Sequence, residues 1–354
     1  MPKSEDLFFH SLKAISPIDG RHRIMTEPLA EWFSEYALFK YRLHLEVEYF
    51  IALSELENFS AVRDFNVEEK SFLRGLVENF SLEDAMEMQN IDRFGFNGQK
   101  PTNHDVKTVE YFLKSRIEKS SLKDMLEMVH FGLTSEDVNN FAFNFMIRGG
   151  LEACYIPALV SLLEKLSEHA RVERNTPMLS RTHGQPATPT TFGKEMANYL
   201  ERLRKELEFL ASIKLPAKLN GAVGNHNAQY FAAPEVDWIK FAERFATKFG
   251  FEPNLFTTQI ESHDGLTRLF SCFVSINNII RDMATDVWLY ISADYLMQKN
   301  VAGEVGSSTM PHKINPWRME VAEGSTVEAN AKFFGFISKL QVSRLQRDLS
   351  DHEA

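Results

Sequence analysis

An apolar repeat with alternating spacings of three and four residues limits the possible folds of this chain more than any other feature. Its members are Leu266, Leu269, Phe273, Ile276, Ile280, Met283, Val287 and Tyr290. This spacing gathers the apolar side chains along one stripe of a helix, as in the helices of a bundle. A helix over residues 262–298 would be about 55 Å long, which favours a bundle of long helices.

Helical patterns recur along most of the chain. They cover residues 29–58, 66–80, 82–90, 103–118, 135–174, 192–213, 235–249 and 320–340, and we expect Gly149, Gly150 and Pro157 to interrupt one of them. No run alternates apolar and polar residues as a half-buried strand does. We therefore predict an all-α fold, with a smaller helical N-terminal domain over residues 1–130 and a central long-helix bundle over residues 131–354.

Composition excludes several classes of protein. With 354 residues, 44% hydrophobic and 25% charged, the chain is globular rather than disordered. Its net charge of −10 argues against a general affinity for nucleic acid or anionic membranes, so an anionic ligand must be met by local bases. Cys154 and Cys272 lie in apolar helical patterns, away from any paired or metal-binding spacing. Because neither a secretory signal nor a long uncharged run is found, we predict a cytoplasmic protein.

The segment of residues 303–316 reads Gly-Glu-Val-Gly-Ser-Ser-Thr-Met-Pro-His-Lys-Ile-Asn-Pro. Gly303 and Gly306 permit backbone angles closed to other residues, and Pro311 and Pro316 exclude regular helix or strand. Its polar groups are the hydroxyls of Ser307, Ser308 and Thr309, the ammonium of Lys313 and the amide of Asn315. Such an irregular loop suits a carboxylate or a phosphate. The alternative is a Gly/Ser linker that happens to contain a lysine.

Two helix starts carry candidate binding groups. In residues 102–107, Thr102 or Asn103 is expected to cap the helix, while the same terminus offers N–H groups and the His104 imidazole to an anion. The capping and binding interpretations both stay open. In residues 132–137, Ser135 is the expected cap, followed by acids in the first turn.

A further loop, residues 179–189, surrounds a histidine. Gly184, Pro186 and Pro189 are expected to prevent regular structure there. A lone histidine is usually a satisfied core or surface residue. His183 is flanked by polar neighbours in a constrained loop, which favours a chemical role.

Several catalytic classes lack their usual residues. The chain has no His-Glu-x-x-His or Cys-x-x-Cys for zinc, and no Gly-x-x-x-x-Gly-Lys-Ser/Thr for phosphoryl transfer. A serine hydrolase is also disfavoured, because the Gly-x-Ser-x-Gly elbow is missing. Gly221 and Gly224 lack the context of a dinucleotide fingerprint. What remains is a candidate acid, a candidate base and an anion-binding loop, spread over several segments. These groups are the ones needed to eliminate a group β to a carboxylate.

The loops together resemble a known family. Residues 306–316 are similar to the signature of the fumarase/aspartase superfamily, and their Met-Pro-His-Lys form resembles the adenylosuccinate lyase family. Further matches are residues 16–21, 102–107, 133–140, 181–188 and 258–261, in family order across almost the whole chain.

The resemblance implies an all-α fold of the fumarase/aspartase type and an enzyme that releases fumarate from adenylosuccinate, giving AMP, and from the succinyl-aminoimidazole-carboxamide ribotide. It implies His183 as general acid and Ser307 as general base. The substrate contacts carried over are Arg21, His22, Asn103, His104, Asp105, Thr134, Ser135, Gln259, Ser308, Lys313, Ile314, Asn315 and Arg347. No metal and no organic cofactor are expected, nor a nucleic-acid or membrane partner. The resemblance also implies a homotetramer whose sites are shared between subunits.

Some features depart from the family pattern. His22 stands where the bacterial pattern usually has Tyr, and the third, C-terminal helical domain of the family is expected to be absent. Two alternatives stay open. One is a cycloisomerase or another lyase of the same superfamily, and the other is a catalytically silent helical structural oligomer, against which the retained His183, Ser307 and Lys313 argue.

Overall fold

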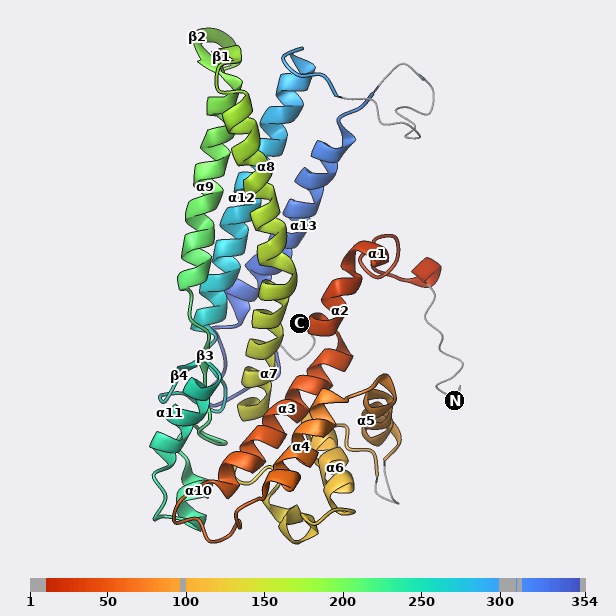
Figure 1. Cartoon of the computed structure of the whole chain (residues 1–354), viewed down its shortest axis with the longest axis vertical. Coiled ribbons are helices and arrows are strands. Elements are labelled where there is room, and N and C mark those ends of the chain that lie inside the picture. Colours follow the sequence, from red (N-terminus) through yellow and green to blue (C-terminus); the bar gives the residue numbers. More distant parts are fainter. Residues whose placement is uncertain (1–10, 96–99, 299–309, 311–313, 351–354) are drawn as a thin grey trace. The chain divides into compact units, whose positions relative to one another are not determined.

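The computed structural model describes residues 11–95, 100–298, 310 and 314–350 (Figure 1). The helices are α1 (Arg23–Thr26), α2 (Ala30–Phe33), α3 (Glu35–Ser54), α4 (Val67–Glu78), α5 (Leu82–Phe94), α6 (Asp105–Ile117), α7 (Ser135–Gly150), α8 (Ile156–Val172), α9 (Phe192–Ser212), α10 (Asn227–Ala232), α11 (Trp238–Lys248), α12 (Asp264–Ser292) and α13 (Trp317–Lys339). Within these described ranges the strands form only two small sheets, β1 (Pro177–Thr182) with β2 (Gln185–Thr191) and β3 (Pro216–Ala217) with β4 (Glu252–Pro253). The predicted all-α class is therefore confirmed.

The chain divides into two compact units. Unit 1 comprises Met1–Pro157, Pro216–Glu261 and Leu345–Arg347, and unit 2 comprises Ala158–Leu215, Ser262–Arg344 and Asp348–Ala354. Each unit thus combines segments that are distant in the sequence. The predicted domain boundary at residue 130 stays a prediction.

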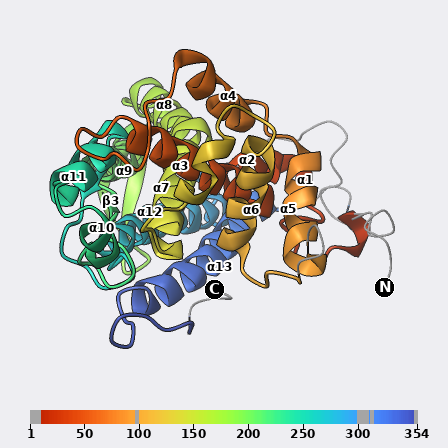
Figure 2. The ribbon, with the colours of Figure 1, turned by 90° about the horizontal axis from the view of Figure 1, so that it is seen from below.

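Helix α3 is the central element of unit 1. It contacts α2, α4, α6 and α7, which surround it in Figure 2. Leu43, Leu45 and Phe50 are fully buried, on different sides of the helix. Ser34 caps its N-terminus, where its side chain accepts a hydrogen bond from the Ala37 N–H. A helix buried on nearly all sides holds its neighbours in fixed positions, including the helices whose N-termini carry candidate site residues.

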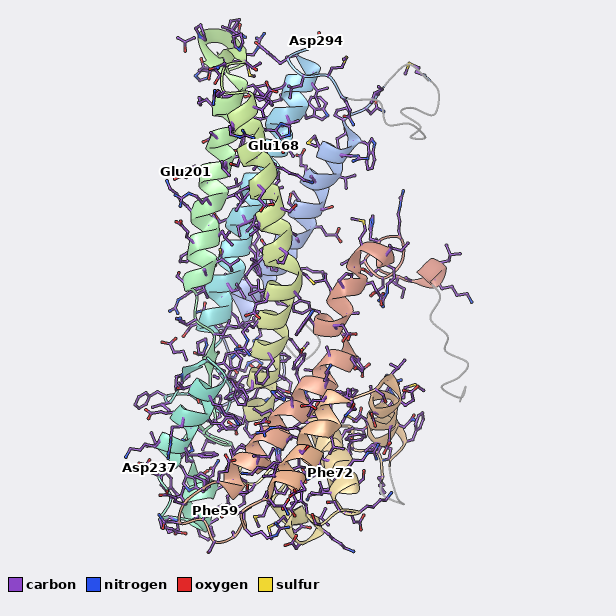
Figure 3. The ribbon with its side chains drawn as sticks, viewed as in Figure 1. Phe59, Phe72, Glu168, Glu201, Asp237 and Asp294 are labelled. Carbon is purple, nitrogen blue, oxygen red and sulfur yellow. The ribbon has the colours of Figure 1, made fainter. Side chains whose placement is uncertain are left out.

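Aromatic rings fill the core of unit 1 between α3, α7 and α11. Phe141 on α7 meets Phe245 on α11 edge to face, with ring centroids 5.5 Å apart. Phe59 meets the buried Trp238 in the same way at 5.6 Å, and Figure 3 labels Phe59 on its loop. Edge-to-face pairs stabilise beyond their buried area, so this cluster fixes the packing of α11 in unit 1.

The expected interruption near Gly149, Gly150 and Pro157 is a change of helix type: α7 ends at Gly150 and α8 begins at Ile156, although the chain stays helical from Ser135 to Val172. The π-helical turn η5 (Leu151–Tyr155) precedes Pro157 and shifts the hydrogen-bonding pattern there. The two glycines also serve packing. A Cβ atom on Gly149 would lie 1.8 Å from the Trp32 ring, and one on Gly150 would lie 2.4 Å from the Phe33 ring.

This helix is also long and apolar enough to cross a membrane by length and composition. Core helices of globular proteins pass the same test. Its Asn140 and Asn144 are buried and donate hydrogen bonds to the backbone oxygens of Lys218 and Pro216 in unit 1. These polar contacts favour packing against protein.

Unit 2 contains the long helices α9, α12 and α13, and most of α8. Helix α12 packs against both α9 and α13. The predicted helix over residues 262–298 is confirmed in type but is shorter, ending at Ser292, because Asp294 adopts a left-handed backbone with φ of 59°. Glu168 on α8 and Glu201 on α9 are exposed, and Figure 3 labels both on the long helices.

The expectation of irregular structure at residues 179–189 is wrong. Strands β1 and β2 form an antiparallel hairpin with an irregularity between Leu179 and Arg181. In a two-stranded ribbon every strand has an outward edge, so prolines such as Pro186 and Pro189 need not remove a ladder hydrogen bond. His183 and Gly184 lie between the strands with φ of 53° and 73°, as the central residues of a type I′ turn require.

Candidate functional site

One group of candidate residues gathers at the N-terminus of α7. The N-cap is Thr134 rather than the expected Ser135, and the Asp137 carboxylate accepts the Thr134 N–H at 2.8 Å. Ser135 is therefore the first residue of the helix, and its hydroxyl is available to other partners. It accepts a hydrogen bond from Arg347 Nη1 at 3.0 Å.

Gln259 completes this group. Its Oε1 lies 3.4 Å from Arg347 Nη1, and its Nε2 donates to the Ala222 carbonyl at 2.9 Å. We call Thr134, Ser135, Gln259 and Arg347 the α7 site. It combines a guanidinium, hydroxyls and the positive end of a helix, and these groups suit a carboxylate or a phosphate.

A buried ion pair lies directly behind the α7 site. Lys218 Nζ and Asp137 Oδ1 are 2.9 Å apart, and both side chains are 0% exposed. The sequence marks Asp137 only as a first-turn acid and gives little indication of Lys218. Its one local signal was a lysine between apolar residues, in Ala217-Lys218-Leu219.

A second group lies at the N-terminus of α6. The cap is His104, whose Nδ1 accepts the Lys107 N–H at 3.3 Å, so the expectation of Thr102 or Asn103 is wrong. Thr102 instead bonds to Asp92 through its hydroxyl at 2.8 Å. Asn103 precedes the cap in a left-handed conformation with φ of 43°. Such a conformation is tolerated by asparagine.

Arg42 on α3 connects the α6 and α7 helix starts. Its Nη1 lies 2.6 Å from Asp105 Oδ2, and its Nε donates to Asn139 Oδ1 at 2.9 Å. Asn139 in turn donates to Glu136 Oε1 at 3.0 Å. Burial lowers the pKa of the Arg42 guanidinium from 12.5, and Asp105 partly offsets this effect. Arg42 was not among the predicted site residues, although an arginine within an apolar helix is a visible signal in the sequence.

The predicted general acid belongs to unit 2. His183 is exposed at the tip of the β1–β2 hairpin. Arg181 secures this tip, because its Nη1 donates to the Gly184 carbonyl at 2.9 Å and its Nε donates to the Tyr295 hydroxyl at 3.1 Å. These two hydrogen bonds therefore stabilise the turn that carries the His183 imidazole.

The other predicted residues lie apart from these groups. Arg21 and His22 are exposed beside α1, whose N-cap position is His22. Ile314 and Asn315 precede α13 in unit 2. Ser307, Ser308 and Lys313 lie outside the described residues. In the described ranges, no group of three or more His, Cys, Asp or Glu residues could hold a metal ion.

Comparisons with known proteins agree with one another. A family model described as lyase matches residues 20–329. The adenylosuccinate lyases of Legionella pneumophila (strain Corby) and Escherichia coli (strain K12) are 45% and 44% identical over 342 residues, which are 96% of this chain and 74% of each relative. The adenylosuccinate lyase of Dictyostelium discoideum is 44% identical over 360 residues, covering 99% of this chain and 75% of that protein.

A solved structure has the same fold. The 3-carboxy-cis,cis-muconate lactonizing enzyme from Pseudomonas putida superposes with a TM-score of 0.68 and is 21% identical, covering 93% of this chain and 68% of that one. At this identity the likeness concerns the fold alone. It confirms the predicted fold of the fumarase/aspartase type.

Proposed function

This chain belongs to the adenylosuccinate lyase family, and on that premise we propose that His183 and Ser307 release fumarate from adenylosuccinate by acid–base catalysis. The enzyme is a carbon–nitrogen lyase. Its products are AMP and fumarate, and the succinyl-aminoimidazole-carboxamide ribotide is its second substrate. The observation that carries the proposal is the identity with adenylosuccinate lyases over 96% of the chain.

In the proposed elimination, Ser307 takes a proton from the carbon next to the one that bears the departing nitrogen. The electron pair left behind forms the new double bond of fumarate as the carbon–nitrogen bond breaks. His183 gives a proton to the departing nitrogen, so AMP leaves as a neutral amine. The base form of Ser307 is its alkoxide, which the ammonium of Lys313 stabilises, and Ser308 is a substrate contact.

The α7 site supports the binding of an anionic substrate. Arg347 offers a charged donor that already contacts Ser135 and Gln259, and the N-terminus of α7 adds a positive dipole. These are three of the substrate contacts that the family resemblance assigns. Asp105 and His104 at the α6 helix start, with Arg21 and His22, are the further contacts in this proposal.

Exposed apolar side chains support a homotetramer. On α13, Trp317, Val321, Val327 and Phe334 are 44–56% exposed. Apolar side chains repeated along one long helix are typical of a surface that another chain covers. Light scattering of the purified protein measures this directly, and a mass four times that of the chain is expected. We place the enzyme in the cytoplasm and propose that it needs no cofactor.

The cycloisomerase alternative is weaker. The lactonizing enzyme shares 21% of aligned residues with this chain, whereas the adenylosuccinate lyases share 41–45%. Turnover of adenylosuccinate, without turnover of 3-carboxy-cis,cis-muconate, would separate the two functions.

The test is fumarate release from adenylosuccinate, followed by absorbance. The unaltered chain should turn over, and His183→Ala and Ser307→Ala should each lower kcat about 100-fold or more. His169→Ala, at an exposed histidine of α8, is the matched control and should keep full activity. An inactive parent would refute the function, while an active His183→Ala variant would refute the assignment of the acid.

A further inference from the structure

A fully buried lysine and aspartate lie behind the α7 site without belonging to it. Lys218 and Asp137 are each 0% exposed and 2.9 Å apart. Two charges removed from water are costly unless each is well paired and hydrogen-bonded. Stability alone is a weak reason for such a pair, since apolar residues of similar size often serve as well.

Lys218 reaches the loop that carries Gln259. Its Nζ donates to the Gln259 carbonyl at 2.7 Å and to the Gly221 carbonyl at 3.0 Å, in addition to its contact with Asp137. The ammonium has three protons and faces three acceptors, so its donors match its partners. Gln259 is therefore fixed at its backbone by a buried cation.

Asp137 holds the other parts of the same site. Its carboxylate accepts the Thr134 N–H at 2.8 Å and so fixes the N-cap of α7, next to Ser135. It also accepts the N–H groups of Asn220 and Gly221, each at 3.1 Å. The pair thus ties together the helix start, the turn at residues 220–221 and the Gln259 loop.

We propose that Asp137 and Lys218 are a positioning pair, which sets the spacing of Ser135 and Gln259 around Arg347 for substrate binding. Neither side chain touches the substrate. The pair acts through backbone groups on both sides of the site. This inference rests on the proposed function, because the α7 site is taken to bind adenylosuccinate.

The test separates positioning from stability by neutralising the pair in two steps. Lys218→Met and Asp137→Asn each leave one buried polar partner uncompensated, and both should lower the urea midpoint of unfolding. The double variant Asp137→Asn/Lys218→Met removes both charges and should regain much of that stability. Its KM for adenylosuccinate should nevertheless stay raised about tenfold, with kcat within about threefold of the parent.

Lys248→Met is the matched control. Lys248 forms an ion pair of 2.6 Å with Glu48 elsewhere in unit 1, so the same chemical change there should affect stability without raising KM. The dissociation constant for adenylosuccinate is measured by calorimetry in parallel. A double variant whose KM and dissociation constant match those of the parent would overturn the positioning role and leave the proposed function intact.

Absence of turnover by the parent would refute the proposed function itself. The dissociation constants then test the positioning role of Asp137 and Lys218: tenfold weaker binding of adenylosuccinate by the double variant supports it. A parent that does not bind adenylosuccinate overturns it.

Discussion

Replacement of Arg42 by lysine tests the link between the two helix starts. The guanidinium contacts Asp105 through Nη1 and Asn139 through Nε, while only 4% of the residue is exposed. Lysine keeps the charge but carries a single ammonium on a flexible stem, so it cannot reproduce these two directed contacts. The variant should keep the ion pair with Asp105 and lose the hydrogen bond to Asn139.

The magnitude follows from burial. The Asn139 oxygen, on a residue only 8% exposed, is left without its donor, which costs about 1–3 kcal/mol. The Asp105 side chain is 42% exposed, so any weakening of its ion pair adds at most about 1 kcal/mol after screening by water. We expect a loss of about 2–3 kcal/mol in the free energy of unfolding.

The control is Arg74→Lys. Arg74 also pairs with a carboxylate of α3, Glu48, but its side chain is 44% exposed and Lys248 contacts the same carboxylate. Its replacement should cost less than about 1 kcal/mol. Unfolding in urea followed by circular dichroism gives both values.

Kinetics give the second readout. Because Arg42 positions Asp105 and, through Asn139, the first turn of α7, its replacement should raise KM for adenylosuccinate several-fold. Arg74→Lys should leave KM unchanged. The positioning role of Arg42 is refuted when Arg42→Lys costs no more stability than Arg74→Lys, or when KM is the same in both variants.

Three further predictions concern other contacts. Burial alone would raise the pKa of Glu48, but hydrogen bonds from Arg74 and Lys248 lower it from 4.5 to about 2. The stabilisation by the Glu48 carboxylate is therefore complete above pH 4.5 and is lost as the pH falls through about 2. Glu48→Gln should lower the free energy of unfolding by about 1–2 kcal/mol at pH 7 and by little at pH 2. Unfolding in urea across this pH range measures both values. Gly224 has φ of 73°, and a Cβ atom there would lie 2.1 Å from the Thr257 carbonyl oxygen. Gly224→Ala should cost about 2 kcal/mol or more in urea unfolding and raise KM by displacing the Gln259 loop, whereas Gly335→Ala, with open space around the added atom, should do neither. Tyr295→Phe removes only the hydroxyl that accepts a hydrogen bond from Arg181. If Arg181 positions His183, kcat should fall about threefold to tenfold with little change in KM. An unchanged kcat would contradict that role.

The sequence alone identified much of the molecule. The apolar spacing from Leu266 to Tyr290 predicted α12 because helical periodicity is a local property, written in residues three and four apart. The family motifs, in order along the chain, predicted the adenylosuccinate lyase family for the same reason, since each motif is a short contiguous string. The family and fold predictions are confirmed.

Local rules were less accurate at element ends. The caps of α6 and α7 each differ by one or two residues from the expected ones, because several neighbouring polar residues can cap a helix and tertiary partners decide among them. The Thr102 hydroxyl donates a hydrogen bond to Asp92, and His104 caps α6 in its place. The hairpin around His183 was missed since proline argues against strands only where a ladder hydrogen bond is needed.

Only the tertiary structure decided which distant side chains meet. Asp137, Lys218, Gln259 and Arg347 come from four separate segments, and no spacing in the sequence records that the buried pair lies behind the site that contains Gln259 and Arg347. The same holds for Arg42, which lies on α3 and reaches the starts of α6 and α7. Helical periodicity is fixed by neighbours along the chain, but the pairing of buried charges is fixed by which loops the packed helices bring together.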